Sequence, residues 1–178
     1  MRRMTPKRIL ARDRRMAAVH EAGHWVMAEW VMAEPWSFSA RIEPTESNSD
    51  YEKTWIGQFQ YLRPSSQRKR KLVAVAGAVA ELCWFGQPVE EELFWLEPGM
   101  MSDSDWRLAG CNPGEPDRAL CRAIEKAGEL LCRNGPLWGN LILKSRDLIG
   151  SSRFFLETTS DGTNLLLTRL RKDTRRRR

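Results

Sequence analysis

The chain contains only two histidines, His20 and His24, and both lie within its longest segment of helix-forming character. From Ala11 to Ala33 there is no proline, Gly23 is the only glycine, and apolar residues recur at steps of three and four. This spacing is typical of one long amphipathic helix. Residues four apart lie on the same face of a helix, so the sequence predicts that the two imidazoles point in the same direction.

Together with Glu21, the histidines form the pattern H-E-x-x-H, here His20-Glu21-Ala22-Gly23-His24. Two imidazoles one helical turn apart can bind one metal ion, and a glutamate directly after the first then lies beside the open coordination position. We therefore expect His20 and His24 to be metal ligands, Glu21 to be the catalytic residue and Zn²⁺ to be the cofactor. Such sites also accept neighbouring transition metals, so the pattern does not fix the metal.

A catalytic zinc needs a third protein ligand. The sequence has no third histidine, and its cysteines have no metal-binding spacing, so the ligand should be a carboxylate. Candidates on predicted helices are Glu81, Asp103 and Asp105. Spacing alone does not choose between them.

The segments after the histidine helix predict a hairpin and a second helix. Apolar and polar residues alternate over Phe38–Glu43 and Trp55–Leu62, which indicates two strands joined by a long polar loop. Ser65 and Ser66 are suitable N-caps for a helix that ends at Gly86. Its small apolar residues favour close packing in the centre of the fold.

The second half of the chain is expected to be helical. Ser102 is a suitable N-cap for a short helix, and residues 117–133 and 136–149 have the pattern of two amphipathic helices, expected as an antiparallel pair. Residues 153–170 fit either a short strand or helical turns. The predicted fold class is therefore α+β and mainly α-helical, with the H-E-x-x-H helix packed against a two-stranded hairpin and a C-terminal helical bundle.

Basic residues are concentrated at the two ends of the sequence. Residues 1–15 and 169–178 each carry a formal charge of +6, whereas the whole chain of 178 residues also carries +6, so the part between them sums to −6. We expect a basic N-terminal arm (1–10), a single domain (11–170) and a basic C-terminal tail (171–178). Solubilising ends and weak nucleic-acid contact through the tails are both open interpretations.

Nothing in the sequence predicts a membrane segment. The longest apolar run, Leu72–Ala80, is far shorter than the roughly 20 residues that cross a bilayer. The basic N-terminus has no apolar stretch behind it that would indicate a signal peptide, so we expect a cytoplasmic protein. In a reducing compartment the four scattered cysteines are expected to be unpaired core or surface residues.

The segment Ala18–Ala28 resembles the zinc-binding helix of the peptidase domain of FtsH-type ATP-dependent metalloproteases. In that family the helix precedes a strand pair, a helix with a Gly-Gly-Arg stretch ending in glycine, and an aspartate ligand in an Asn-Asp-x-x-x-Ala segment. Corresponding segments follow here in the same order over most of residues 11–150, and they read FSARIEP, WIGQFQYLRP, AGAVAELCWFG and SDSDWRLAG.

The resemblance implies a zincin-like helix and selects Asp105 as the third ligand, because Ala109 follows it at the family's spacing. Ala78 stands where the family has arginine, and Met101 and Ser104 stand where glycine and asparagine are usual. The ATPase module and membrane anchors of the family have no counterpart in the sequence, so we expect a stand-alone peptidase domain.

These features predict a zinc metalloendopeptidase that hydrolyses peptide bonds in flexible or unfolded protein segments. Glu21 would take a proton from the attacking water and pass it to the leaving amine. The edge of the Trp55–Leu62 strand is a candidate for holding an extended substrate, and Glu81 for orienting the site. Arg107 is a candidate for stabilising the oxyanion.

Two other functions remain open from the sequence. One is a non-catalytic binding module that keeps the metal for stability or partner recognition, and it predicts metal binding without turnover. The other is a regulatory zincin that cleaves one specific partner, and it predicts a strict sequence preference. The expected partner is a protein or peptide substrate, with no membrane. The oligomeric state is not indicated.

Overall fold

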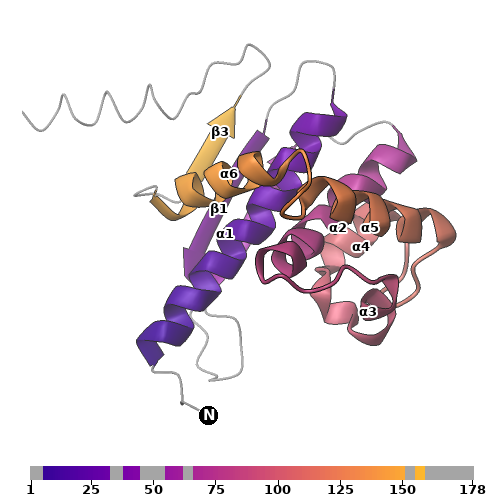
Figure 1. Ribbon diagram of the computed structural model, residues 1–178, viewed down its shortest axis with the longest axis horizontal. Coiled ribbons are helices and arrows are strands. Elements are labelled where there is room, and N and C mark those ends of the chain that lie inside the picture. The colour runs from indigo at the N-terminus through magenta and orange to yellow at the C-terminus, as the bar shows by residue number, and fades with distance from the viewer. Residues whose placement is uncertain (1–5, 33–37, 45–54, 62–65, 151–154, 159–178) are drawn as a thin grey trace, which may run out of the picture.

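The computed structural model describes residues 6–32, 38–44, 55–61, 66–150 and 155–158 (Figure 1). Over these residues the fold is mainly helical with a small antiparallel sheet, which confirms the α+β prediction. The elements in chain order are α1 (Pro6–Val31), β1 (Phe38–Pro44), β2 (Trp55–Tyr61), α2 (Gln67–Trp84), α3 (Glu91–Leu96), the 3₁₀ turn η1 (Pro98–Met100), α4 (Asp103–Ala109), α5 (Arg118–Leu131), α6 (Trp138–Gly150) and β3 (Phe155–Thr158).

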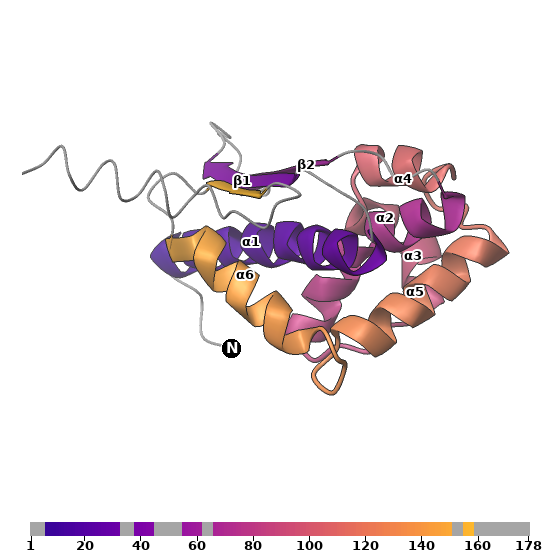
Figure 2. The ribbon, with the colours of Figure 1, turned by 90° about the horizontal axis from the view of Figure 1, so that it is seen from above.

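Helices α1 and α2 pack against each other in the centre of the fold (Figure 2). The contact is close because Gly23 of α1 has no side chain: a Cβ there would overlap the carbonyl oxygen of Ala76 and lie 2.6 Å from Cβ of Ala80. Alanines of α2 are fully buried against α1. Helix α1 begins at Pro6, five residues before the predicted start at Ala11.

The sheet lies along one side of α1 and has the strand order β2-β1-β3 (Figure 2). The predicted hairpin is present, with Ile42 of β1 opposite Gly57 of β2. The undecided C-terminal segment supplies β3, which pairs with the other edge of β1 through Ala40 and Leu156. Alternation explains the orientation of β1, because Ala40 and Ile42 are buried and Arg41 between them is exposed. Among the described strands, β2 has a neighbour on one side only.

The prediction that α5 and α6 form an antiparallel pair is wrong. Helix α5 packs on α2, helix α6 packs on α1, and the two diverge from their connection (Figure 2). The reason is that each helix of the central α1–α2 pair has a further apolar face, and each of these faces must be buried against another element. The C-terminal helices therefore enclose the central pair instead of forming a bundle of their own.

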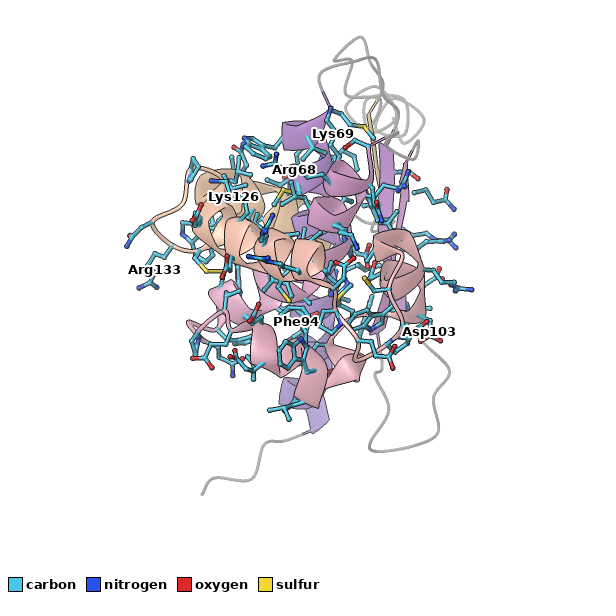
Figure 3. The ribbon with its side chains drawn as sticks, turned by 90° about the vertical axis from the view of Figure 1, so that its right-hand side faces the viewer. Arg68, Lys69, Phe94, Asp103, Lys126 and Arg133 are labelled. Atoms are coloured by element: carbon cyan, nitrogen blue, oxygen red, sulfur yellow. A yellow bond between two sulfur atoms is a disulfide. The ribbon has the colours of Figure 1, made fainter. Side chains whose placement is uncertain are left out.

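Two short helices connect α2 to α5. Helix α3 is anchored by Phe94, whose side chain is fully buried (Figure 3). Helix α4 begins at the predicted N-cap Ser102, whose side chain accepts a hydrogen bond from the backbone N–H of Asp105. It ends at Gly110, whose φ of 70° is the left-handed conformation that favours glycine.

Lys71, near the start of α2, ties the end of α4 to the start of α5. Its side chain is buried, and its ammonium group donates hydrogen bonds to the carbonyl oxygen of Ala109 (2.8 Å), to Sγ of Cys111 (3.2 Å) and to Oδ2 of Asp117 (3.0 Å). Asp117 is also the N-cap of α5 and accepts a hydrogen bond from the backbone of Leu120. The position of α4 relative to α2 therefore depends on one buried cation.

The expectation that the cysteines are unpaired is wrong for two of them. Cys83, in the last turn of α2, forms a disulfide with Cys132 at the end of α5, whereas Cys111 and Cys121 are free. Disulfides are typical of oxidising compartments, so this pair does not support the cytoplasmic prediction. In the part of the chain that the structure describes, no helix is both long enough and apolar enough to cross a bilayer.

Candidate metal centre

Helix α1 presents His20, Glu21 and His24 to one cleft. The imidazole rings are 4.8 Å apart between centroids and inclined at 73°, so they converge edge to face instead of stacking. His24 and Glu21 are buried and His20 is half-buried. The helical spacing of the H-E-x-x-H pattern thus brings both imidazoles to one place.

Each histidine has its Nδ1 atom committed to a hydrogen-bond acceptor. Nδ1 of His24 lies 2.7 Å from the carbonyl oxygen of Val73, and Nδ1 of His20 lies 2.7 Å from Oε1 of Glu81. A carbonyl or carboxylate oxygen can only accept, so both Nδ1 atoms donate a proton. When neutral, both rings therefore present the lone pair of Nε2 to the cleft, which is the form that binds a metal.

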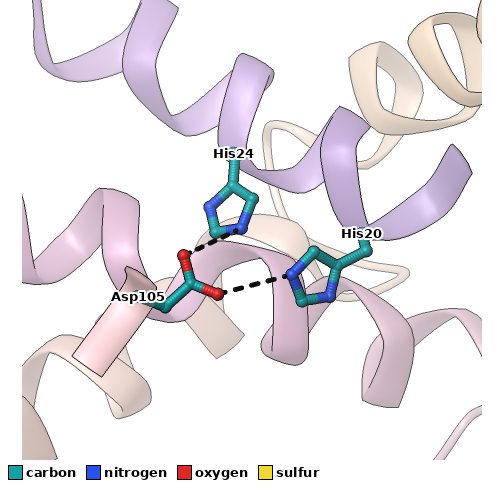
Figure 4. A group of neighbouring side chains, drawn as sticks. All are labelled: His20, His24 and Asp105. Carbon is teal, nitrogen blue, oxygen red and sulfur yellow. Dashed lines mark ion pairs between the residues drawn. The ribbon is translucent and has the colours of Figure 1, made fainter. Parts of the chain in front are cut away.

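The two Nε2 atoms face the carboxylate of Asp105 on α4 (Figure 4). Nε2 of His20 is 3.6 Å from Oδ2, and Nε2 of His24 is 3.5 Å from Oδ1. These separations are long for hydrogen bonds, but they are near the roughly 3.4 Å expected between ligands on one tetrahedral zinc ion. Potential ligand atoms of the three residues all lie within 4.8 Å of one another.

The start of α4 fixes the position of Asp105. Its Oδ2 accepts hydrogen bonds from Oγ (2.7 Å) and from the backbone N–H (3.2 Å) of Ser102, and its own backbone N–H donates to Ser102 Oγ. This reciprocal arrangement is a capping box. The carboxylate is therefore oriented by the backbone geometry of its own helix.

The other two carboxylates left open by the sequence are placed elsewhere. Asp103 is exposed at the first turn of α4 (Figure 3) and does not belong to the group formed by His20, His24 and Asp105. Glu81, on α2, contacts Nδ1 of His20, not the Nε2 side of the ring. The structure thus brings Asp105 together with the two histidines and places Glu81 against Nδ1 of His20.

The charges of the group suit a cation. Burial alone would lower the pKa of His20, but the facing carboxylate of Asp105 and the hydrogen-bonded carboxylate of Glu81 raise this pKa to about 10. Burial lowers the pKa of His24, although Asp105 opposes the shift. Burial would raise the pKa of Asp105, but His24 and His20 hold it below its ordinary value. The carboxylates thus stabilise positive charge at His20, which a metal dication can supply instead of a proton.

The cleft in front of the group has a volume of about 660 Å³. Its walls come from α1, from the residues Trp55 to Phe59 of β2, from η1 and from α4. Arg107 also lines it and is exposed, and Nε of Arg107 donates a hydrogen bond to the carbonyl oxygen of Asp103. Strand β2 thus lies beside the candidate ligands.

Two parts of the centre were not found by sequence reasoning. The carbonyl oxygen of Val73, which fixes His24, belongs to the backbone and has no side-chain signal. The small volumes of Gly57 and Gly77 beside the site depend on tertiary packing. In the sequence Gly57 lies in an alternating strand pattern and Gly77 in an apolar run, and no motif marks either glycine.

Comparison with known proteins adds no family. No protein-family model matches the chain, and no curated protein matches it significantly.

Proposed function

We propose that the chain is a zinc-dependent peptidase. The observation that carries this proposal is the shared orientation of His20 and His24: both Nδ1 atoms donate to fixed acceptors, and both Nε2 atoms face Asp105. Two imidazoles and one carboxylate are the donor set of many catalytic zinc sites, which leave a further position open. The group lies in an open cleft large enough for a peptide, which favours a catalytic site over a closed structural one.

The metal would be held by His20, His24 and Asp105. When bound, it supplies a Lewis acid that lowers the pKa of water and polarises a carbonyl group. Glu21 is buried in the wall of the same cleft, one residue after His20, and its carboxylate accepts the proton of the attacking water. Glu21 then returns this proton to the amine nitrogen as the peptide bond breaks. Glu81 keeps Nδ1 of His20 protonated, which leaves Nε2 as the ligand atom.

The proposed substrate is an extended segment of polypeptide. Among the strands that the structure describes, β2 is at an edge of the sheet, and its residues from Trp55 to Phe59 line the cleft beside the histidines. An extended peptide can add to such an edge through main-chain hydrogen bonds. Because the peptide must be extended to pair, flexible or unfolded segments are the proposed targets. The resemblance to FtsH-type peptidases supports the same reaction, and membership of that family is part of the proposal.

The test compares the native chain with Glu21→Gln. Metal content is measured by elemental analysis after loading with zinc, and cleavage is measured with casein as an unfolded substrate. We expect about one zinc in both proteins and a loss of cleavage of roughly 100-fold or more in the variant. Glu97→Gln, which changes an exposed carboxylate at the end of α3, is the matched control and should behave like the native chain.

Zinc binding by the native chain without cleavage of casein would contradict the general peptidase. A library of defined peptides then separates the two alternatives, because a regulatory zincin would cleave a narrow set and a binding module would cleave none. The basic tails proposed for nucleic-acid contact lie largely outside the described residues, so that interpretation rests on sequence alone.

A further inference from the structure

Strand β2 contacts the side chain of Glu21 at a glycine. A Cβ atom built on Gly57 would overlap Cγ, Cδ and Oε1 of Glu21. The backbone of Gly57 is not in the left-handed region, so its conformation does not require glycine. Gly57 pairs normally with Ile42 of β1. Glycine is required at this position because any side chain would occupy the space of the Glu21 carboxylate.

A second glycine lies against the candidate ligands. A Cβ atom built on Gly77 of α2 would be 2.5 Å from Nε2 of His20 and 2.6 Å from Nε2 of His24. Gly139 of α6 does not line the cleft and differs from both, because a Cβ there would meet no atom within 4 Å. The structure therefore places one glycine against the proposed base and one against the proposed ligands, whereas Gly139 has free space.

We propose that Gly57 is a positioning residue for Glu21. A glutamate side chain has three rotatable bonds, and its carboxylate can act as a base only if these hold it at the attacking water. The backbone of β2 occupies one side of this side chain and restricts where the carboxylate lies. The same strand is the proposed docking edge for the peptide, so one strand would position both the base and the substrate. The kinetic consequence rests on the proposed peptidase function, whereas the contact itself does not.

The first experiment measures kinetics and zinc content of Gly57→Ala. We expect full zinc binding and a fall in kcat of about 100-fold with little change in KM, since a displacement of about 1 Å at a catalytic group has that effect. Gly77→Ala should instead lose zinc, and Gly139→Ala should match the native chain in both measurements. Native kcat in Gly57→Ala would overturn the proposal, and so would loss of zinc from it. A rise in KM at unchanged kcat would assign Gly57 to substrate pairing and would also overturn it.

The second experiment tests the contact without any use of activity. Gly57→Ala is expected to lower the melting temperature by about 5 °C, because the added methyl group is overpacked against Glu21. In a Glu21→Ala background the atoms in its way are gone, so the same substitution should cost much less. An equal loss in both backgrounds would overturn the proposal, as would failure of both Gly57→Ala chains to fold. If Gly57→Ala folds only together with Glu21→Ala, the proposal is supported.

The two experiments also separate this proposal from the proposed function. If the native chain binds zinc and cleaves nothing, the peptidase proposal fails. The melting temperatures of Gly57→Ala in the native and Glu21→Ala backgrounds still decide whether Gly57 makes room for the side chain of Glu21.

Discussion

Oε1 of Glu81 accepts a 2.7 Å hydrogen bond from Nδ1 of His20, so a carboxylate on α2 orients an imidazole on α1. The two residues are 61 positions apart in the sequence and meet because α1 and α2 pack closely. The bond fixes the tautomer of His20 and makes its Nε2 more basic.

We predict that Glu81→Ala weakens zinc binding by about 10- to 100-fold without abolishing it. His20 would keep its place on α1 but lose the acceptor that holds its ring. Competition against a chromophoric chelator measures the affinity, and Glu97→Ala serves as an exposed control. An unchanged affinity would show that Glu81 does not orient the ligand.

For the third ligand, we predict that Asp105→Asn leaves the protein with less zinc than one ion per chain, whereas Asp103→Asn retains full loading. The two residues are on the same short helix, but only Asp105 faces both Nε2 atoms. An amide is a much poorer zinc ligand than a carboxylate. Elemental analysis of both proteins after dialysis decides the matter, and equal loading would contradict the assignment of Asp105.

Lys71 is expected to stabilise the fold over the pH range in which both Lys71 and Asp117 are charged. We predict that Lys71→Met lowers the free energy of unfolding by about 2 kcal/mol, because hydrogen bonds from a buried charged donor are lost. Lys126→Met, which removes an exposed ion pair with Glu129, should cost less than about 0.5 kcal/mol. Urea unfolding at neutral pH measures both.

The same pair predicts a pH dependence. The hydrogen bond from Lys71 lowers the pKa of Asp117, so its stabilising effect is present above the ordinary carboxyl value of 3.8 and is lost as pH falls through the lowered pKa. Burial lowers the pKa of Lys71, but Asp117 and Cys111 outweigh it and raise this pKa, so that contribution is complete below 10.5 and is lost as pH rises further. The difference in stability between the native chain and Lys71→Met should therefore shrink at both extremes. The acid end of the measurement is pH 2, roughly two pH units below the ordinary carboxyl pKa. A difference in unfolding free energy that stays constant from neutrality down to this pH would contradict the ion pair.

The disulfide gives a further prediction. Reduction, or the double substitution Cys83→Ser with Cys132→Ser, should lower the free energy of unfolding by about 4 kcal/mol, because the bond closes a loop between residues 49 apart. Thermal unfolding with and without reductant provides the measurement. The double variant is its own control, since reductant should not change its stability. A native chain insensitive to reductant would contradict the bond.

Local patterns in the sequence were sufficient for most of the secondary structure. The apolar spacing of α1 and the alternation in β1 are set by neighbours within a few residues, and Ser102 was recognisable as an N-cap. The placement of α5 and α6 could not be predicted from such patterns, because an amphipathic helix shows which of its faces is buried but not which helix covers that face. The pairing of Cys83 with Cys132 could not be predicted for a similar reason, because the spacing of cysteines does not determine which of them pair.

The candidate site divides in the same way. His20, Glu21 and His24 are on one helix, so their spacing alone places them together. Asp105 is on another helix, and spacing alone does not distinguish it from Asp103 and Glu81, whereas the family resemblance does. The acceptor for His24 is a backbone carbonyl, which every residue possesses, so no sequence pattern could have indicated Val73.

The capping box of α4 links the position of a ligand to the first turn of a helix. Ser102 and Asp105 hold each other, so the point at which the chain becomes helical and the point at which the carboxylate faces the histidines are set together. An insertion between α3 and Ser102 would lengthen the connection before the cap, whereas one between Ser102 and Asp105 would break the cap and move the carboxylate. We therefore expect this connection to tolerate changes in length up to Ser102 and to tolerate none in the three residues that follow.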